Sequence, residues 1–337
     1  MLYYQLLFRE QLNLLANVGW WRMGVGNELA ARREVLKEVS KAIVGKDEVI
    51  VRAFLAILAR GHILIEDIPG VGKTTLAIAF SKALSLEYRR VQFTPDVLPS
   101  DVTGFSVFDK ETNSMTYTPG AIMSNLFLAD ELNRATSRTQ SALLEAMEEG
   151  QVTVDGVSHE LKQPFIVIAT QNPVGAAGTQ LLPDSQMDRF MVRLSLGYPA
   201  FDDELDLVDR KQGKNLVDLV EPILSSSDLE VMREEVDKIH VDKAILNYIV
   251  NIVAQTRDNP DLLLGASPRA SLALVAMTKA MAYLQGRNYA VPKDVLPIVE
   301  DTLAHRLLLR SGAEKDNITA AKIVQRIVGR VAPPKIG

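Results

Sequence analysis

The sequence predicts an α/β fold, an αβα sandwich around a parallel sheet, followed by an all-helical domain. Short continuous apolar runs alternate with helical stretches, which is typical of parallel strands buried on both faces. One run leads into a glycine-containing loop and a helix. After Tyr198 and Pro199 the runs stop, and charged helical stretches separated by prolines follow. The runs are HILIE (62–66), RVQFT (90–94), NLFLAD (125–130), FIVIAT (165–170) and FMVRLSL (190–196).

Length and composition support a folded protein of about two domains. The chain has 337 residues, of which 47% are apolar and 23% are charged. The net charge of −5 provides no global positive field for nucleic acid or an anionic membrane. The absence of cysteine excludes disulfides, thiolate metal sites and cysteine nucleophiles, and it suits a cytoplasmic protein. The four histidines, at 62, 159, 240 and 305, show no metal-ligand spacing.

Residues 1–26 form an N-terminal extension rich in Leu, Tyr and Trp. Arg9, Glu10 and Arg22 interrupt it, so it matches neither a secretory signal nor a transmembrane segment, and we expect no membrane-spanning helix. We expect a short amphipathic helix that packs on the domain or on a neighbouring subunit. A role at a membrane surface, or an extension outside the fold, remains an alternative.

The core domain is expected over residues 27–200. It begins with apolar residues at helical spacing, which predict two helices with a break at VGK (44–46) before the first strand. Two hairpins are predicted within it. One has its turn at 109–114, and the other turns at Asp155 and Gly156, a strong hairpin signal. Residues 201–337 form the predicted helical domain.

The loop in GHILIEDIPGVGKTTLAIAF (61–80) is a candidate phosphate-binding loop, although the GxxxxGK[ST] pattern has Asp67 in place of its first glycine. Backbone N–H groups at the start of the helix form an anion site, Lys73 reaches the β and γ phosphates, and the Thr74 hydroxyl ligates Mg²⁺. The alternative is an ordinary tight turn. We expect the Asp67 carboxylate to point away from the triphosphate, so Asp67→Gly leaves ATP binding nearly unchanged. The predicted nucleotide-binding residues of the loop are Pro69, Gly70, Val71, Gly72, Lys73, Thr74 and Thr75.

Two further strands end in polar residues at the edge where α/β sheets bind ligands. Asp130 is expected to hold Mg²⁺, and Glu131 to orient or deprotonate the attacking water. On the next strand, the amide of Asn172 can bond both this water and the γ-phosphate. The simpler alternatives have no function in catalysis: the two acids would begin a solvated helix, and Asn172 would be a polar cap at the end of its strand.

Arg189 and Arg269 are candidates to stabilise the charge that develops on the transferred phosphoryl group. Arg189 precedes the last apolar run, and Arg269 opens a helix of the second domain. An isolated arginine is more often a solvated surface residue.

The order of these motifs resembles that of the AAA+ ATPases, and the match is close to the MoxR family, in the clade with a helix 2 insert and a hairpin before sensor 1. The resemblance covers roughly residues 30–310. It is carried by LIEDIPGVGKT, LFLADELNRATSRTQSALLEAMEEGQVTV, FIVIATQNP, MDRF, GASPRA and VPKDVLPIVEDTLAHRL.

The resemblance implies a P-loop NTPase core with a helical lid, assembled as a homo-oligomeric ring that is commonly hexameric, with ATP between the two domains and against the next subunit. The motif matches are Walker A at Lys73 and Thr74, Walker B at Asp130 and Glu131, sensor 1 at Asn172, sensor 2 at Arg269, the arginine finger at Arg189 and the adenine contact at Val44 and Gly45. Arg134 and Arg138 are alternatives to Arg189 for the trans-acting arginine. The LLEAMEEG helix is interpreted as a packing surface.

The resemblance also implies a Mg²⁺-dependent ATPase that remodels or activates client proteins together with a von Willebrand factor A domain partner. A nucleic-acid motor is disfavoured, because VTVDGVSHELK offers only His159 and one lysine. A chelatase-type motor subunit and a nucleotide-gated scaffold are further alternatives. No residue identifies the client.

Overall fold

The computed structural model describes residues 27–111, 113–172, 182–213, 215–312 and 318–335. The predicted amphipathic helix of the N-terminal extension lies outside these residues. None of the described helices is long and apolar enough to cross a membrane.

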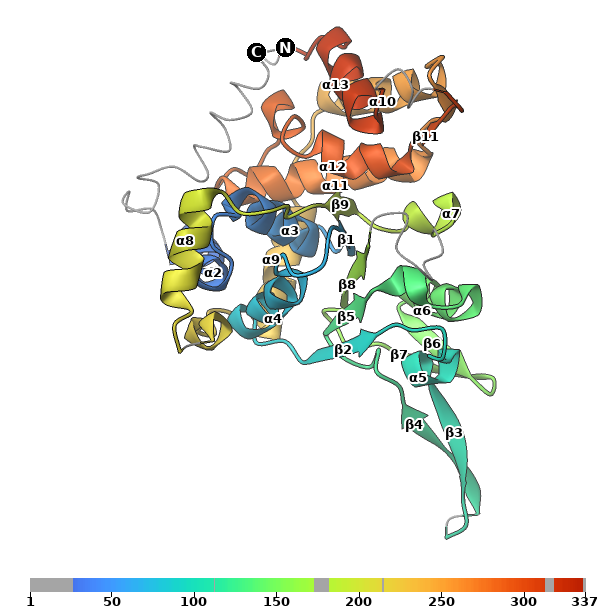
Figure 1. Cartoon of the computed structure of the whole chain (residues 1–337). Coiled ribbons are helices and arrows are strands. Elements are labelled where there is room, and N and C mark those ends of the chain that lie inside the picture. Colours follow the sequence, from blue (N-terminus) through green and yellow to red (C-terminus); the bar gives the residue numbers. More distant parts are fainter. Residues whose placement is uncertain (1–26, 112, 173–181, 214, 313–317, 336–337) are drawn as a thin grey trace.

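A five-stranded parallel sheet forms the centre of the core, with the strand order β2-β5-β8-β1-β9 (Figure 1). All five strands fall within or next to the predicted apolar runs, so the predicted α/β fold is confirmed. The strands are β1 (Ile63–Glu66), β2 (Tyr88–Gln92), β5 (Leu126–Asp130), β8 (Ile166–Gln171) and β9 (Val192–Leu194).

Alternate side chains of these strands enter two separate apolar cores. On one face, Ile63 and Leu128 pack with helices α2 (Asn27–Ala42), α3 (Asp47–Leu58) and α4 (Lys73–Ala83). On the other face, Leu64 and Phe127 pack with α5 (Pro99–Thr103) and α6 (Ser137–Glu149). The predicted break between the first two helices is confirmed by Gly45, which has φ of +70°.

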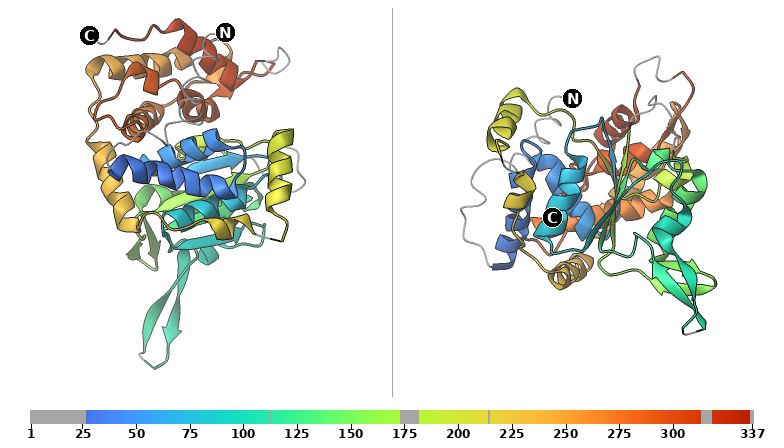
Figure 2. Two further views of the ribbon diagram at one scale, coloured as in Figure 1. Left: turned by 90° about the vertical axis from the view of Figure 1, so that its left-hand side faces the viewer. Right: turned by 60° about the horizontal axis from the view of Figure 1, so that its bottom comes forward.

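Both predicted hairpins are present, and each is a two-stranded antiparallel sheet. The first, β3 (Gly104–Asp109) with β4 (Ser114–Pro119), projects away from the body (Figures 1 and 2). The second, β6 (Gln151–Val154) with β7 (Val157–Glu160), turns at Asp155 and Gly156, both with positive φ. Tyr117 of β4 stacks on His159 of β7 with ring centroids 3.7 Å apart, so the two hairpins contact one another.

The C-terminal part is mainly helical, as predicted, and α10 to α13 gather above the sheet in Figure 1. One difference is a small antiparallel pair of strands, β10 (Leu262–Leu264) and β11 (Leu308–Leu309). These strands are too short to give a periodic signal. The helices after β8 are α7 (Asp184–Met187), α8 (Phe201–Arg210), α9 (Ser226–Asp237), α10 (Lys243–Arg257), α11 (Pro268–Leu284), α12 (Val299–Leu303) and α13 (Ala320–Arg330). Short 3₁₀ turns are η2 (Leu132–Arg134), η3 (Leu216–Leu219), η4 (Pro292–Asp294) and η5 (Ala304–Arg306).

Helix α9 packs on the core helix α3. The buried Arg233 donates from Nε to the carbonyl of Ile57 at 2.9 Å, and Arg60 pairs with Glu230 at 2.7 Å. Part of the segment after residue 200 therefore lies against the core domain. The domain boundary at residue 200 stays a prediction.

Candidate functional site

The glycine loop joins the end of β1 to the start of α4 in the conformation that an anion site requires. Gly70 and Gly72 have φ of +88° and +98°, values that L side chains rarely adopt. A Cβ atom built on Gly70 would meet no other atom within 4 Å, so the space in front of the loop is open. Backbone N–H groups at the N-terminus of α4 border this space, and the loop can therefore accept a phosphate chain.

Lys73 reaches from the first turn of α4 across the ends of the strands. Its Nζ donates to the carbonyl of Asp67 at 2.5 Å and to Oδ1 of Asn172 at 3.3 Å. The side chain is buried, and this burial lowers the pKa of Lys73 below its ordinary value, although nearby carboxylates act in the opposite direction. The lysine is thus held at the strand ends, where the resemblance places the β and γ phosphates.

Asp67 uses its carboxylate to connect the loop to the chain around β9. Oδ2 accepts from Ser195 Oγ at 2.9 Å and from the backbone N–H of Gly197 at 2.7 Å, and Oδ1 accepts from the N–H of Ile68 at 2.8 Å. Burial alone would raise the pKa of this carboxyl, but the hydrogen bonds outweigh it and hold the pKa below its ordinary value. The carboxylate is directed toward β9, in agreement with the expectation that it points away from the phosphates.

Asp130 ends β5 beside the loop and is buried with both oxygens bonded. Oδ2 accepts from Arg90 Nε and Nη2 at 3.0 and 2.7 Å, and Oδ1 accepts from Thr170 Oγ1 at 2.6 Å. Carboxylate and hydroxyl oxygens, here from Asp130 and Thr74, are the ligands that Mg²⁺ uses together with substrate phosphates. These residue types fit the cation, and the joint binding of Mg²⁺ by Thr74 and Asp130 stays a prediction. The described residues contain no cluster of three or more His, Asp or Glu that would suit a metal ion held by protein groups alone.

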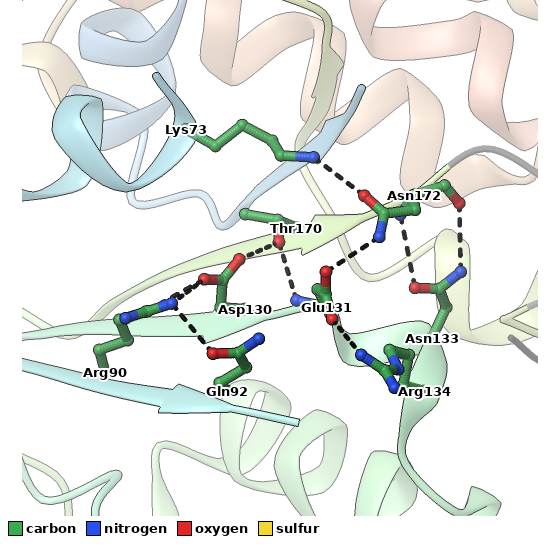
Figure 3. Close-up of polar contacts among 9 residues, drawn as sticks. All are labelled: Lys73, Arg90, Gln92, Asp130, Glu131, Asn133, Arg134, Thr170 and Asn172. Atoms are coloured by element: carbon green, nitrogen blue, oxygen red, sulfur yellow. Dashed lines mark hydrogen bonds and ion pairs between the residues drawn. The ribbon is translucent and has the colours of Figure 1, made fainter. Parts of the chain in front are cut away.

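Glu131 and Asn172 form the centre of the polar cluster (Figure 3). Glu131 Oε1 accepts from Asn172 Nδ2 at 3.1 Å, and Oε2 accepts from Arg134 Nη1 at 2.8 Å. The hydrogen bond from Arg134 outweighs burial and, with that from Asn172, holds the pKa of Glu131 below its ordinary value, so the carboxylate is ionised. Glu131 has φ of +57°, a left-handed conformation that is unusual for glutamate and occurs at functional sites.

The neighbours of this cluster include residues that the motifs did not identify. Asn133 exchanges two hydrogen bonds with the backbone of Asn172, at 3.2 and 3.4 Å, and Arg90 binds Asp130. Asn133 lies within the quoted LFLADELNRA segment, whereas Arg90 depends on the pairing of β2 with β5. Of the alternative trans-acting arginines, Arg134 pairs with Glu131 of its own chain and Arg138 is exposed.

The predicted adenine contact lies close to the loop. A Cβ atom placed on Gly72 would lie 3.6 Å from Cδ1 of Ile43, its nearest neighbour. The 43–45 segment therefore borders the glycine loop. Gly45 packs against Asp203 of α8, where a Cβ atom would come within 2.2 Å of its Oδ2. The contact of Val44 and Gly45 with adenine stays a prediction.

Arg189 and Arg269 come together with each other rather than with the Lys73 cluster. Arg189 Nη1 donates to the carbonyl of Leu144 at 2.6 Å and lies 3.1 Å from Oε2 of Glu148, and Arg269 pairs with the other oxygen of Glu148. In the described part of the chain neither arginine contacts Lys73 or Glu131. The expected place of ATP, between the two domains and against the next subunit, stays a prediction.

The position of Arg269 follows from the docking of α11. The hydroxyl of Ser267, the N-cap of α11, donates to Asp188 Oδ2 at 2.9 Å. Asp188 is the residue before Arg189, so this bond brings the start of α11 to the edge of the core beside α6. The LLEAMEEG helix, interpreted from sequence as a packing surface, also supplies the acid that both arginines bind.

Comparisons with known proteins agree with these observations. The model of the ATPase family associated with various cellular activities (AAA) matches residues 62–192, and that of the AAA lid domain matches residues 254–327. The chain is 44% identical to the uncharacterized protein YeaC of Bacillus subtilis, over 89% of this chain and 94% of YeaC. It is 35% identical to Chaperone MoxR1 of Mycobacterium tuberculosis, over 93% of this chain and 85% of MoxR1.

A solved structure is also similar over nearly the whole chain. The crystal structure of a candidate ATPase from Cytophaga hutchinsonii superposes with a TM-score of 0.85 at 37% sequence identity. The similarity covers 91% of this chain and 96% of that one.

Proposed function

The chain belongs to the MoxR family of AAA+ ATPases, and from this premise we propose that it is a Mg²⁺-dependent ATP-hydrolysing ring motor that remodels or activates client proteins. ATP hydrolysis follows from the family itself. The metal, the ring, the client and the roles of individual residues are the parts that we propose.

The observation that carries the proposal is the amide of Asn172, which joins Lys73 to Glu131. Its oxygen accepts from Lys73 and its nitrogen donates to Glu131, so the phosphate-binding cation and the water-orienting acid form one unit. Lys73 and the loop N–H groups hold the phosphates. The ionised Glu131 accepts a proton from, or orients, the attacking water. Mg²⁺ held by Thr74 and Asp130 would neutralise charge on the phosphate oxygens.

The positions of the two arginines support an assembly in which ATP is shared between subunits. Each chain carries a phosphate-binding cluster at the ends of β1, β5 and β8, and an arginine pair beside α6 that does not contact this cluster. We propose that Arg189 and Arg269 act on ATP bound by the neighbouring subunit, in a ring of six. This arrangement makes hydrolysis dependent on assembly.

The projecting β3–β4 hairpin supports a protein rather than a nucleic-acid client. Its exposed side chains include Phe105, Phe108 and Met115, which are 47%, 53% and 60% exposed. Apolar side chains on a projecting element suit contacts with unfolded or partly folded protein, whereas nucleic-acid motors require basic groups there. A von Willebrand factor A domain partner and a cytoplasmic location are retained from the family resemblance and the cysteine-free composition.

Measuring the ATPase rate with unfolded protein, with single-stranded DNA and with double-stranded DNA at low salt tests the client class. We expect stimulation by a reduced, carboxymethylated protein and little response to DNA. Strong and salt-sensitive stimulation by DNA would instead establish the nucleic-acid motor. The partner is tested by crosslinking Glu131→Gln with ATP in extracts of the source cell, where a von Willebrand factor A domain protein should be enriched over a Lys73→Ala control that cannot hold ATP.

A further inference from the structure

The acid near the end of α6, Glu148, lies between the two candidate trans-acting arginines. One carboxylate oxygen is 3.1 Å from Nη1 of Arg189, and the other is paired with Nη2 of Arg269. The Glu148 side chain is 35% exposed, and those of Arg189 and Arg269 are 30% and 49% exposed. One carboxylate therefore joins the core arginine to the lid arginine.

Two further charged residues lie close to the Arg189–Glu148–Arg269 contacts. A third arginine, Arg306, is buried nearby and pairs with Asp188 at 3.3 Å. Burial, together with the charge of Arg269, lowers the pKa of Arg306 to about 10, despite the attraction of Asp188. The cluster thus contains three guanidinium groups and two carboxylates. Without Glu148, Arg189 and Arg269 would repel each other and separate.

Helix α6 is fixed in a way that gives Glu148 a defined position. The helix ends at Gly150, which has φ of +66°, and the carbonyl of Met147 accepts from Nε2 of His62 at 3.2 Å. The carbonyl of Leu144, one turn earlier, accepts from Arg189 at 2.6 Å. The same helix follows Glu131 and η2 in the chain, so it connects the hydrolytic acid to the arginine pair.

We propose that Glu148 is a positioning residue that holds Arg189 and Arg269 side by side, so that one chain presents them together to the ATP of its neighbour. This inference rests on the proposed role of the two arginines in trans. A partly exposed ion pair contributes little to the stability of the fold, on the order of 0–1 kcal/mol, so the arrangement is better explained by the geometry that it sets.

Steady-state kinetics of the assembled protein provide the first test. We expect Glu148→Gln to lower kcat by about 10- to 100-fold and to change KM by less than about threefold. An arginine finger raises kcat by about 10³- to 10⁵-fold, and a displaced arginine loses part of this effect. Glu148→Asp should recover part of the loss. Glu149→Gln is the matched control, because Glu149 is the next residue, is exposed and has no polar partner among the described residues. Parent-like kcat in Glu148→Gln would overturn the proposal.

Mixed assemblies separate positioning across the interface from a purely structural effect. Glu148→Gln subunits keep the Lys73–Glu131 cluster, and Glu131→Gln subunits keep the arginine pair, so mixing them should create complete sites and a rate above the sum of the separate rates. Arg189→Ala mixed with Glu131→Gln is the control. If ATPase activity recovers only in this control mixture, Glu148 does not act through the arginines, and the proposed function stands. If neither mixture recovers ATPase activity, the arginines do not act on the neighbouring subunit, and the inference about Glu148 is wrong as well.

Discussion

At the scale of single residues, sequence motifs identified three residues of the candidate site that the structure brings together, but not the residues that support them. Lys73, Glu131 and Asn172 follow strands that the apolar runs predicted, and the ends of parallel strands meet at one edge. The structure brings these three together. Arg90 and Glu148 could not be predicted, because their partners are set by strand pairing and by the docking of α11, which join residues far apart in the chain.

Glu131→Gln tests the role of the central acid. Because glutamine cannot accept a proton from water but keeps the size of the side chain, we expect ATP binding within about threefold of the parent and kcat reduced by about 10²-fold or more. Nucleotide titration and single-turnover hydrolysis measure the two effects. A Glu131→Gln protein that hydrolyses ATP as fast as the parent would show that another group orients the water.

Asp67→Gly tests whether the aspartate in the loop stabilises the fold or contributes to nucleotide binding. We expect the Kd for ATP to change less than about tenfold, or 1.4 kcal/mol, since the carboxylate is directed toward β9. The free energy of unfolding should fall by about 1–2 kcal/mol, because the partly buried N–H groups of Ile68 and Gly197 and the hydroxyl of the exposed Ser195 lose a charged acceptor. Asp67→Asn, which keeps one acceptor oxygen, should lose less stability. Weakened binding at unchanged stability would assign Asp67 a direct role with nucleotide.

His62 predicts a defined pH dependence of stability. Burial is the main cause that lowers its pKa to about 4, and Nδ1 must stay unprotonated to accept from the N–H of Val167. Because the unfolded chain takes up this proton near pH 6.5, stability should decrease as the pH falls from about 6.5 to 4, by up to about 3 kcal/mol. Below pH 4 this contribution no longer changes.

Denaturant unfolding of the parent and of His62→Gln over pH 4–8 measures this effect. His305 is also buried with a lowered pKa and adds a loss of the same sign, so the difference between the two proteins isolates His62. Identical pH profiles for parent and variant would contradict the assignment.

At the scale of elements, the sequence predicted those with a strong periodic or turn signal. The parallel strands, both hairpins and the break between α2 and α3 are confirmed. The β10–β11 pair was missed because its strands have three and two residues. The stack of Tyr117 on His159 was also beyond prediction, since it depends on how two separate hairpins pack together.

The β3–β4 hairpin should be required for contact with protein clients but not for hydrolysis itself. Phe108 and Met115 are opposite one another and exposed, so their change to serine should leave basal kcat and thermal stability close to those of the parent. Binding of a reduced, carboxymethylated protein in the presence of ATP should be reduced about tenfold or more. The matched control is Val157→Ser on the other hairpin, which is exposed to a similar extent at 57%. Equal losses in both variants would contradict a specific role for β3–β4.

At the scale of the whole molecule, the candidate site residues form two separate groups, and we propose that each group is one half of an ATPase site. Lys73 at the start of α4 meets Glu131 and Asn172, which follow β5 and β8. Arg189, which follows α7, and Arg269, at the start of α11, both bind Glu148 of α6. The family resemblance implied that ATP lies between the core and the lid and against the next subunit. Glu148 pairs with Arg269 and Ser267 binds Asp188, so both arginines lie beside α6, and we propose that they act on the ATP of a neighbouring subunit.

The most direct test of this account is the ATPase rate per subunit measured across the concentration range in which the protein assembles, with the oligomer mass determined in parallel. We expect the rate to rise with the assembled fraction, and Arg189→Ala to assemble while remaining at the low rate of single chains. Full activity in dilute single chains, or parent-like activity of assembled Arg189→Ala, would contradict a site completed by the neighbouring subunit.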